Sequence, residues 1–168
     1  TAFSAFVGQN YGAGKPDRIF KGYFISIGVI SVVGIFATAL LIFASRPIFS
    51  YFIPEEEAIK MGVVYLKILG VSQLFMCLEI TTAGAFNGFG KTALPAITSI
   101  VFTGLRVPAA MILSKPDMLG LDGVWWSISI SSIIKGVLLP TLFMLLIANN
   151  KKFRASLIED SLNSGRSA

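Results

Sequence analysis

Long apolar runs separated by short polar links dominate the hydrophobic pattern of this chain. Residues 22–45 contain no charged side chain, and as a helix they would extend about 36 Å, which is enough to cross a bilayer. Three further runs of similar length follow. The pattern therefore predicts an all-α, polytopic transmembrane helix bundle, whose four full spans are expected at about residues 17–48 (starting at Asp17 or Ile19), 57–86, 92–113 and 123–149.

The chain opens on an apolar stretch of seven residues before Gly8, which is too short to cross a bilayer. We interpret this stretch as the end of a fifth helix and the chain as a piece of a longer protein. Residues 1–150 are then expected to form one transmembrane unit. Residues 151–168 are polar and are expected to form a short tail.

Turn and capping residues separate the predicted spans. Asp17 and Asp122 are predicted N-caps, and Thr92 is predicted to cap the third span. The glycine-rich segment GQNYGAG lacks the GK[ST] ending of a phosphate-binding loop and does not follow a strand. It predicts a helix that ends at the polar Gln9 and Asn10 and then a tight turn, with no nucleotide site.

Composition narrows the classes of function. Hydrophobic residues make up 54% and charged residues 14% of the 168 positions, and the mean hydropathy is +0.76, so the lipid bilayer is the expected surrounding. A lone Cys77 and the absence of histidine exclude a disulfide framework and argue against a zinc or histidine-based site. We therefore expect no enzyme, no metal and no cofactor. The net charge of +5 does not come from an aromatic-interleaved basic surface, so no nucleic-acid partner is expected.

The basic residues predict how the chain is oriented, because positively charged links tend to stay in the cytoplasm. One side holds only Arg46, Lys60 and Lys115, together with several acids. We therefore expect a multi-pass protein of the plasma membrane with a cytoplasmic C-terminus. The side expected to be cytoplasmic holds Lys15, Arg18, Lys21, Lys91, Lys151, Lys152, Arg154 and Arg166.

Ionisable residues inside predicted spans are candidates for function, since a charge at mid-bilayer is costly. Helix rise places Lys67 about 15 Å from the outer side, Glu79 about 33 Å from it, and Lys135 about 18 Å from it. Arg106 lies about 21 Å from the cytoplasmic side. Each basic side chain either lines a polar cavity or reaches toward an interface or a carbonyl. Glu79, the one acid within a span, is a candidate for binding a cation or a proton, or it snorkels.

Glu79 shares a helical stripe with Ser72, Met76 and Ala83, at intervals of three or four residues. If this stripe faces a cavity, Met76 supplies a soft apolar wall beside the carboxylate, although packing explains it equally well. Gln73 is a further possible polar contact, either with a ligand or between helices.

Two prolines fall inside predicted spans and are expected to kink them. Pro108 and Pro140 each remove one helix hydrogen bond, so each is a candidate hinge or an ordinary membrane-helix proline. Gly84 and Gly88 form a small-xxx-small pair that indicates a close contact between helices.

Three motifs in order along the chain resemble the multidrug and toxic compound extrusion (MATE) family. TAFSAFVGQNYGAGKPDR, at the start, looks like the end of the family's eighth helix and its loop. GAFNGFGKTALP, from Gly84 to Pro95, resembles the link between the tenth and eleventh helices. LGLDGVWWSISIS, from Leu119 to Ser131, resembles the start of the last helix. The resemblance covers the chain up to about residue 150.

The resemblance implies helices nine to twelve of a twelve-helix antiporter, that is, most of its C-terminal lobe. Such proteins export organic cations and other toxic compounds in exchange for Na+ or H+, so the implied partners are lipid, small drugs and the N-terminal lobe. Many members carry an acid about one turn before Glu79, where this chain has Met76. Two alternatives stay open: a related flippase for lipid-linked saccharides, favoured if Lys67, Arg106 and Lys135 line one cationic cavity, and a non-transporting membrane scaffold subunit.

Overall fold

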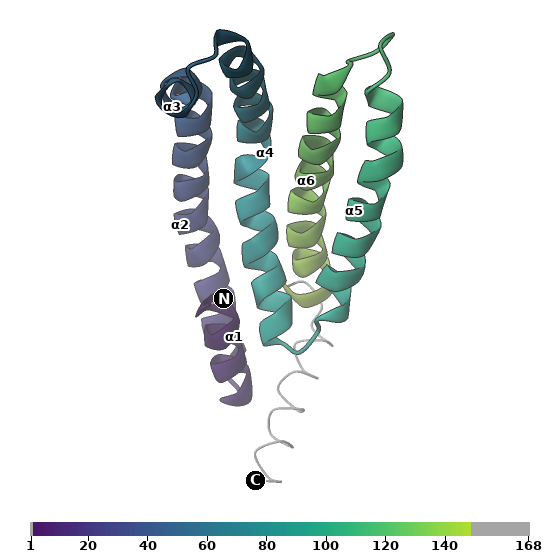
Figure 1. The fold of residues 1–168 in the computed structure, drawn as a ribbon. Coiled ribbons are helices and arrows are strands. Elements are labelled where there is room, and N and C mark those ends of the chain that lie inside the picture. The colour runs from purple at the N-terminus through teal and green to yellow at the C-terminus, as the bar shows by residue number, and fades with distance from the viewer. Residues whose placement is uncertain (1, 149–168) are drawn as a thin grey trace.

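The apolar runs form long helices that stand side by side (Figure 1). The structure is a computed structural model, and it describes residues 2–148. Within this range four stretches are long and apolar enough to cross a membrane: Pro16–Phe43, Glu56–Gly88, Ala93–Leu113 and Leu121–Leu146. The prediction of an all-α polytopic membrane bundle is therefore confirmed. The helices are α1 (Ala2–Gly12), α2 (Pro16–Phe43), α3 (Ser45–Phe52), α4 (Glu56–Gly88), α5 (Ala93–Leu113) and α6 (Leu121–Phe143), followed by a π-helical segment η1 (Met144–Ala148).

The long helices form a row in the order α2, α4, α6 and α5 (Figure 1). Helix α4 lies at the centre, because it packs against α2 on one side and α6 on the other. Helix α5 packs mainly against α6, and α1 packs against the ends of α2 and α4. Several polar groups on α4 and α6, such as Ser72, Ser129 and Lys135, are therefore buried between helices.

The N-terminal segment is helical, and it continues further than the sequence predicted. Helix α1 runs through Gln9 and Asn10 to Gly12, and the Asn10 side chain donates a hydrogen bond to the Phe6 carbonyl at 2.8 Å. The turn falls instead at Gly14, whose φ is 65°. Only glycine adopts this φ without steric cost, so the chain reverses at the last glycine of the motif.

The first predicted span ends earlier than expected. It was expected to continue to residue 48, but α2 ends at Phe43 and α3 starts at Ser45 after a break at Ala44. Pro47 explains the break, since its ring would clash with the carbonyl of Phe43 in a continuous helix. The new direction lets Arg46 pair with Glu56 at 2.9 Å across the α3–α4 connection.

The predicted N-caps are wrong for two of the three helices. Lys15 and Gly120 take the N-cap positions of α2 and α6, while Asp17 and Asp122 lie inside the first turn. Pro16 is preset for the first helical position and so moves Asp17 inside. Thr92 does take the N-cap position of α5, without a side-chain capping hydrogen bond.

The buried core lies at the end of the bundle where α1 packs. Its centre is a stack of the Tyr23 and Phe143 rings, whose centroids are 3.9 Å apart. The Tyr23 hydroxyl is also 2.9 Å from the Thr82 hydroxyl, so the polar end of this ring is satisfied within the core. This cluster joins α1, α2, α4 and α6 through Val7, Ile19, Tyr23, Ala85, Phe86, Phe89, Leu139 and Phe143.

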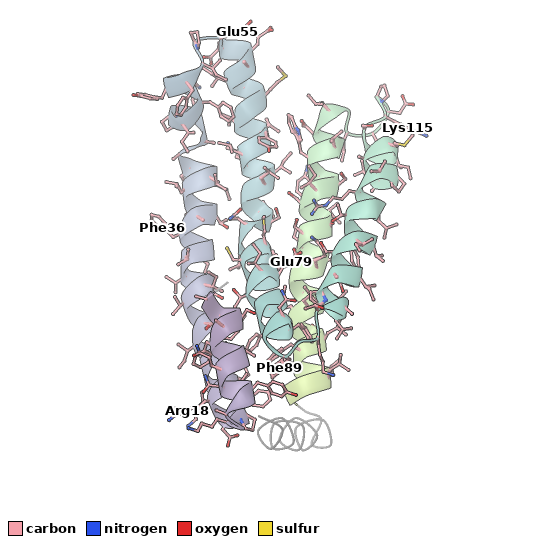
Figure 2. All side chains as sticks on the ribbon, turned by 60° about the horizontal axis from the view of Figure 1, so that its bottom comes forward. Arg18, Phe36, Glu55, Glu79, Phe89 and Lys115 are labelled. Atoms are coloured by element: carbon pink, nitrogen blue, oxygen red, sulfur yellow. The ribbon has the colours of Figure 1, made fainter. Side chains whose placement is uncertain are left out.

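The two ends of the bundle differ in their charged residues. Figure 2 shows Arg18 and Phe89 near one end and Glu55 and Lys115 near the other. The links at the Arg18 end carry Lys15 and Lys91, whereas the opposite end carries the acids of the α3–α4 connection. Links rich in basic residues and links with acids therefore alternate between the two ends of the bundle, as the sequence predicted. The tail predicted at residues 151–168 lies outside the described residues.

Candidate functional site

A buried ion pair joins α4 to α6. The Lys135 ammonium on α6 lies 2.7 Å from Oε1 of Glu79 on α4. The two side chains are 7% and 14% exposed, respectively, so the pair is largely shielded from the surroundings of the bundle. Each charge would be costly alone in such a place, and the contact neutralises both. Two of the charged residues predicted inside spans are thus each other's partner.

Glu79 also lines a cavity between four helices. This cavity has a volume of about 260 Å³ and is lined by residues of α1, α4, α5 and α6. Polar groups reach it from three helices, through Ser4 of α1, Asn87 of α4 and Ser99 of α5. The cavity therefore combines one carboxylate with neutral polar groups and apolar walls. The remaining wall is formed by Ile80, Ala83, Gly84, Pro95 and Leu139.

Two glycines mark close contacts of α4 with its neighbouring helices. A β-carbon at Gly136 would collide with the backbone of Phe75 on α4, so α6 approaches α4 closely one residue after Lys135. A β-carbon at Gly88 would collide with Val7 and the Ser4 carbonyl on α1. The close contact predicted from the Gly84 and Gly88 pair is thus present at Gly88, while Gly84 lines the cavity.

Serine hydroxyls fix α6 between its two neighbours. Ser129 donates a hydrogen bond to the Ile68 carbonyl on α4 at 2.8 Å and lies 3.3 Å from the Ser72 hydroxyl. On another face of α6, Ser131 donates to the Phe102 carbonyl on α5 at 3.2 Å. Such contacts orient helices in lipid, because the hydrophobic effect does not drive helices together there. They set the rotation of α6 that directs Lys135 toward Glu79.

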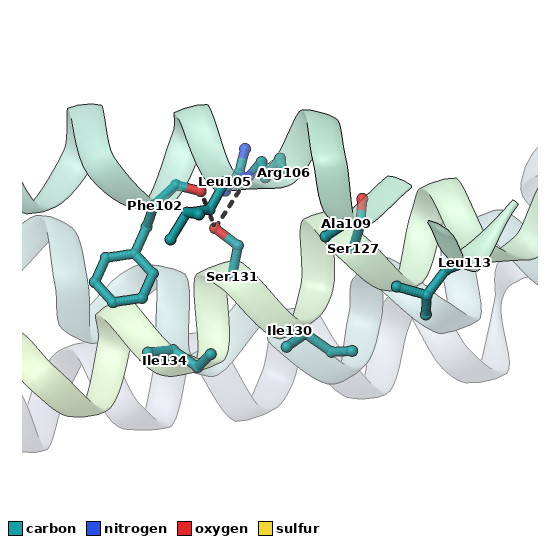
Figure 3. A pocket seen from close by; sticks show the side chains of 9 residues that line it. All are labelled: Phe102, Leu105, Arg106, Ala109, Leu113, Ser127, Ile130, Ser131 and Ile134. Atoms are coloured by element: carbon teal, nitrogen blue, oxygen red, sulfur yellow. Dashed lines mark hydrogen bonds between the residues drawn. The ribbon is translucent and has the colours of Figure 1, made fainter. Parts of the chain in front are cut away.

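Arg106 of α5 makes a separate polar contact with α6. Its Nε donates to the Ser131 hydroxyl and one terminal nitrogen donates to the Ser132 hydroxyl, both at 3.0 Å. Figure 3 shows the Arg106–Ser131 contact at the edge of a smaller cavity of about 160 Å³. The other walls of this cavity are mostly apolar, with Phe102 and Ile134 among them. Arg106 therefore lies outside the cavity that Glu79 lines.

The remaining sequence candidates are not among the residues that line the Glu79 cavity. Lys67 is exposed on α4, and Met76 is 45% exposed, so neither contributes to the wall of the Glu79 cavity. Gln73 is half-buried on the same helix. Pro108 and Pro140 fall within helices α5 and α6, which continue past them. Their role as hinges stays a prediction.

Sequence reasoning found both partners of the ion pair but not their pairing. It also missed Ser4, Asn87 and Ser99, which bring polar atoms to the cavity. The signal for Asn87 was its place beside Gly88 at the end of an otherwise apolar span. For Ser4 and Ser99 the sequence offers no comparable signal, because single serines are common in membrane helices.

Comparisons with known proteins place the chain in a family. The family model described as MatE matches residues 1–112. The chain belongs to the MatE family. Among its relatives, a probable multidrug resistance protein NorM of Thermotoga maritima is 30% identical over 149 residues, which are 86% of this chain and 31% of that protein. A protein of the same name from Chromobacterium violaceum is 31% identical over 83% of this chain and 31% of its own length.

More distant relatives of this MatE chain include a plant protein. Protein DETOXIFICATION 14 of Arabidopsis thaliana is 25% identical over 146 residues, 86% of this chain and 30% of that protein. The chain thus spans a little under a third of the length of these relatives. The match to the MatE family model includes Glu79 and most of the cavity, whereas Lys135 lies beyond its last matched residue.

Proposed function

We propose that the full-length protein is a secondary active antiporter that exports toxic organic cations in exchange for Na+ or H+. The observation that carries this proposal is a carboxylate, Glu79, in the wall of a cavity between the membrane helices of a MatE family chain. A carboxylate in such a place can bind a cation or a proton when it is released from Lys135, because few solvent dipoles compete with it. The apolar walls beside it suit the hydrophobic part of an organic cation.

The proposal extends to the arrangement of the whole protein. Residues 1–150 would form most of the C-terminal lobe, and the other lobe would lie in the remainder of the protein. Transporters built from repeats place their sites between such units. The basic end of the bundle, with Arg18, would face the cytoplasm, as would the C-terminus, in the plasma membrane.

The geometry favours this proposal over the two alternatives. A flippase for lipid-linked saccharides was favoured if three basic side chains lined one cavity. Instead, Lys67 is exposed, Arg106 binds serine hydroxyls and Lys135 pairs with Glu79. A scaffold subunit was favoured if the interior charges paired with each other or snorkelled and left no polar cavity. Lys135 and Glu79 do pair, but a cavity with polar groups adjoins Glu79. A fluorescent lipid-linked saccharide in a vesicle flipping assay provides the direct comparison.

The test uses the full-length protein in cells that lack their own drug exporters. Ethidium accumulation is measured with and without an ionophore that collapses the Na+ or the H+ gradient. We expect the wild-type protein to lower accumulation, and collapse of the coupling gradient to abolish this effect. The Glu79→Gln change should strongly reduce export, since it removes the charge of the carboxylate but keeps the shape of the side chain.

Glu57→Gln is the matched control, because it makes the same chemical change at an exposed position near the start of α4. It should export ethidium like the wild-type protein at equal abundance. Wild-type accumulation that equals that of empty cells, with or without ionophore, would disprove the proposed function. Normal export by the Glu79→Gln variant would remove Glu79 from the mechanism.

A further inference from the structure

The Glu79 carboxylate has two neighbours: the cavity that it lines and the Lys135 ammonium. The carboxylate lines the cavity, but Lys135 is not part of the cavity wall and is 5% exposed. The positive charge that neutralises Glu79 in this contact is therefore supplied from inside the protein, by α6. Any cation in the cavity meets a carboxylate that is already paired.

The surroundings of Lys135 favour its contact with Glu79. On α6, Ser131 and Ser132 lie four and three residues before Lys135 and so on a neighbouring part of the helix surface. Their hydroxyls hold the guanidinium of Arg106. The second positive charge thus lies on the α5 side of α6, whereas the carboxylate that attracts the ammonium lies on α4.

Lysine suits a reversible contact of this kind. Its ammonium is a compact charge on a flexible four-carbon stem, and it makes no planar two-point contact of the arginine type. The observed contact joins one nitrogen and one carboxylate oxygen, at 2.7 Å. A rotation of the lysine stem is the smallest motion that would break the pair.

We propose that Lys135 is a tethered competitor that sets the affinity of this cavity for cations: a monovalent cation binds Glu79 only by displacing the Lys135 ammonium. This inference rests on the proposed function, because it describes how the same site chooses its cargo or coupling ion. It assigns to Lys135 the role of a specificity residue. A cavity whose carboxylate is neutralised internally admits weakly bound cations and releases them readily.

The size of the effect follows from the fraction of time that the carboxylate is free. Apparent affinity falls in proportion to the competent fraction, so each tenfold fall in the fraction of free carboxylate weakens cation binding about tenfold. Removal of the ammonium should therefore raise cation affinity about tenfold or more. This gain in cation affinity should require the Glu79 carboxylate.

The test measures equilibrium binding of tetraphenylphosphonium, and separately of Na+, to the purified full-length protein. Lys135→Met removes the ammonium and nearly keeps the length of the side chain. We expect it to bind tetraphenylphosphonium about tenfold more tightly than the wild-type protein does. Lys135→Arg keeps the positive charge and can contact Glu79 at two points, so it should bind tetraphenylphosphonium no more tightly than the wild-type protein does. Lys60→Met, at an exposed position of α4, is the matched control for loss of one positive charge.

A double variant decides whether Lys135 acts through Glu79. In Glu79→Gln protein, the further change Lys135→Met should give little gain, because no carboxylate is released. An equal gain in both backgrounds would overturn the proposal in favour of general charge repulsion, and so would unchanged binding of both cations by Lys135→Met. If that variant does not fold, Lys135→Gln carries the same test, since it keeps a hydrogen-bond donor for Glu79.

Comparison of the two cations distinguishes an effect on cargo binding from an effect on binding of the coupling ion. A gain for tetraphenylphosphonium alone places cargo selectivity at Lys135, and a gain for Na+ alone places ion selectivity there; either supports the proposal. Failure of the proposed function has a different signature. It shows as absent ethidium export by the wild-type protein, whereas the inference fails on the binding ratio between Lys135→Met and wild type.

Discussion

Lys135 and Glu79 are 56 residues apart in the chain, yet their charged atoms lie 2.7 Å apart between α4 and α6. The contact is the product of helix packing, because neither residue has an oppositely charged partner within its own helix at this depth. It turns two costly intramembrane charges into a neutral unit. The carboxylate of this pair lines the cavity. The same pair therefore contributes to the stability of the bundle and to the proposed transport role.

The first prediction concerns the stability of this pair. Lys135→Met or Glu79→Gln should each destabilise the protein, by about 3–5 kcal/mol where the remaining charge stays buried and unpaired. The double variant should recover much of this loss, because no charge then remains unpaired. Thermal unfolding of the full-length protein in detergent, followed by fluorescence-detected gel filtration, measures the three variants. Additive losses would show that the two residues do not interact in solution.

The second prediction concerns the close approach of α6 to α4. Gly136→Ala places a methyl group against the backbone of Phe75 and should cost about 1–3 kcal/mol through overpacking. Gly104→Ala is the control, because a β-carbon there has nothing within contact distance, and alanine favours the helix. The same unfolding assay compares the two variants. Equal stability of both would contradict the packing of α4 on α6.

The third prediction concerns the contact of Arg106 with α6. Arg106→Lys keeps the charge but loses the two-point geometry to the Ser131 and Ser132 hydroxyls. Its expected cost is about 1.5–3 kcal/mol, the usual value for hydrogen bonds to a charged group. Replacement of both serines by alanine should remove most of the difference between arginine and lysine. A difference of unchanged size in that background would exclude the serines as its cause.

The fourth prediction concerns the sidedness of the bundle. In a Cys77→Ser background, the single changes Arg18→Cys and Lys115→Cys should give thiols that react with a membrane-impermeant maleimide from opposite sides. Both positions are exposed and lie near opposite ends of the bundle. We expect the Lys115→Cys protein to be labelled in intact cells and the Arg18→Cys protein only after permeabilisation. The reverse pattern would invert the proposed orientation.

The amino-acid sequence by itself determined the class of fold. A charge-free run over residues 22–45 and three further apolar runs specify membrane helices, because length and hydropathy alone decide whether a segment crosses a bilayer. The same pattern gave the positions of the links. It also showed that links rich in basic residues alternate with links that carry acids. The helix boundaries were less certain, as at Pro47, where one predicted span became two helices.

Only the tertiary structure decided which polar groups meet. Periodicity placed Ser72, Met76 and Glu79 on one stripe, but the fold buries Ser72 against Ser129, pairs Glu79 with Lys135 and leaves Met76 exposed. Helix periodicity gives the direction of a side chain relative to its own axis. The rotation of α6 against α4, fixed by glycine and serine contacts, determines its partner, and that rotation depends on residues distant in sequence.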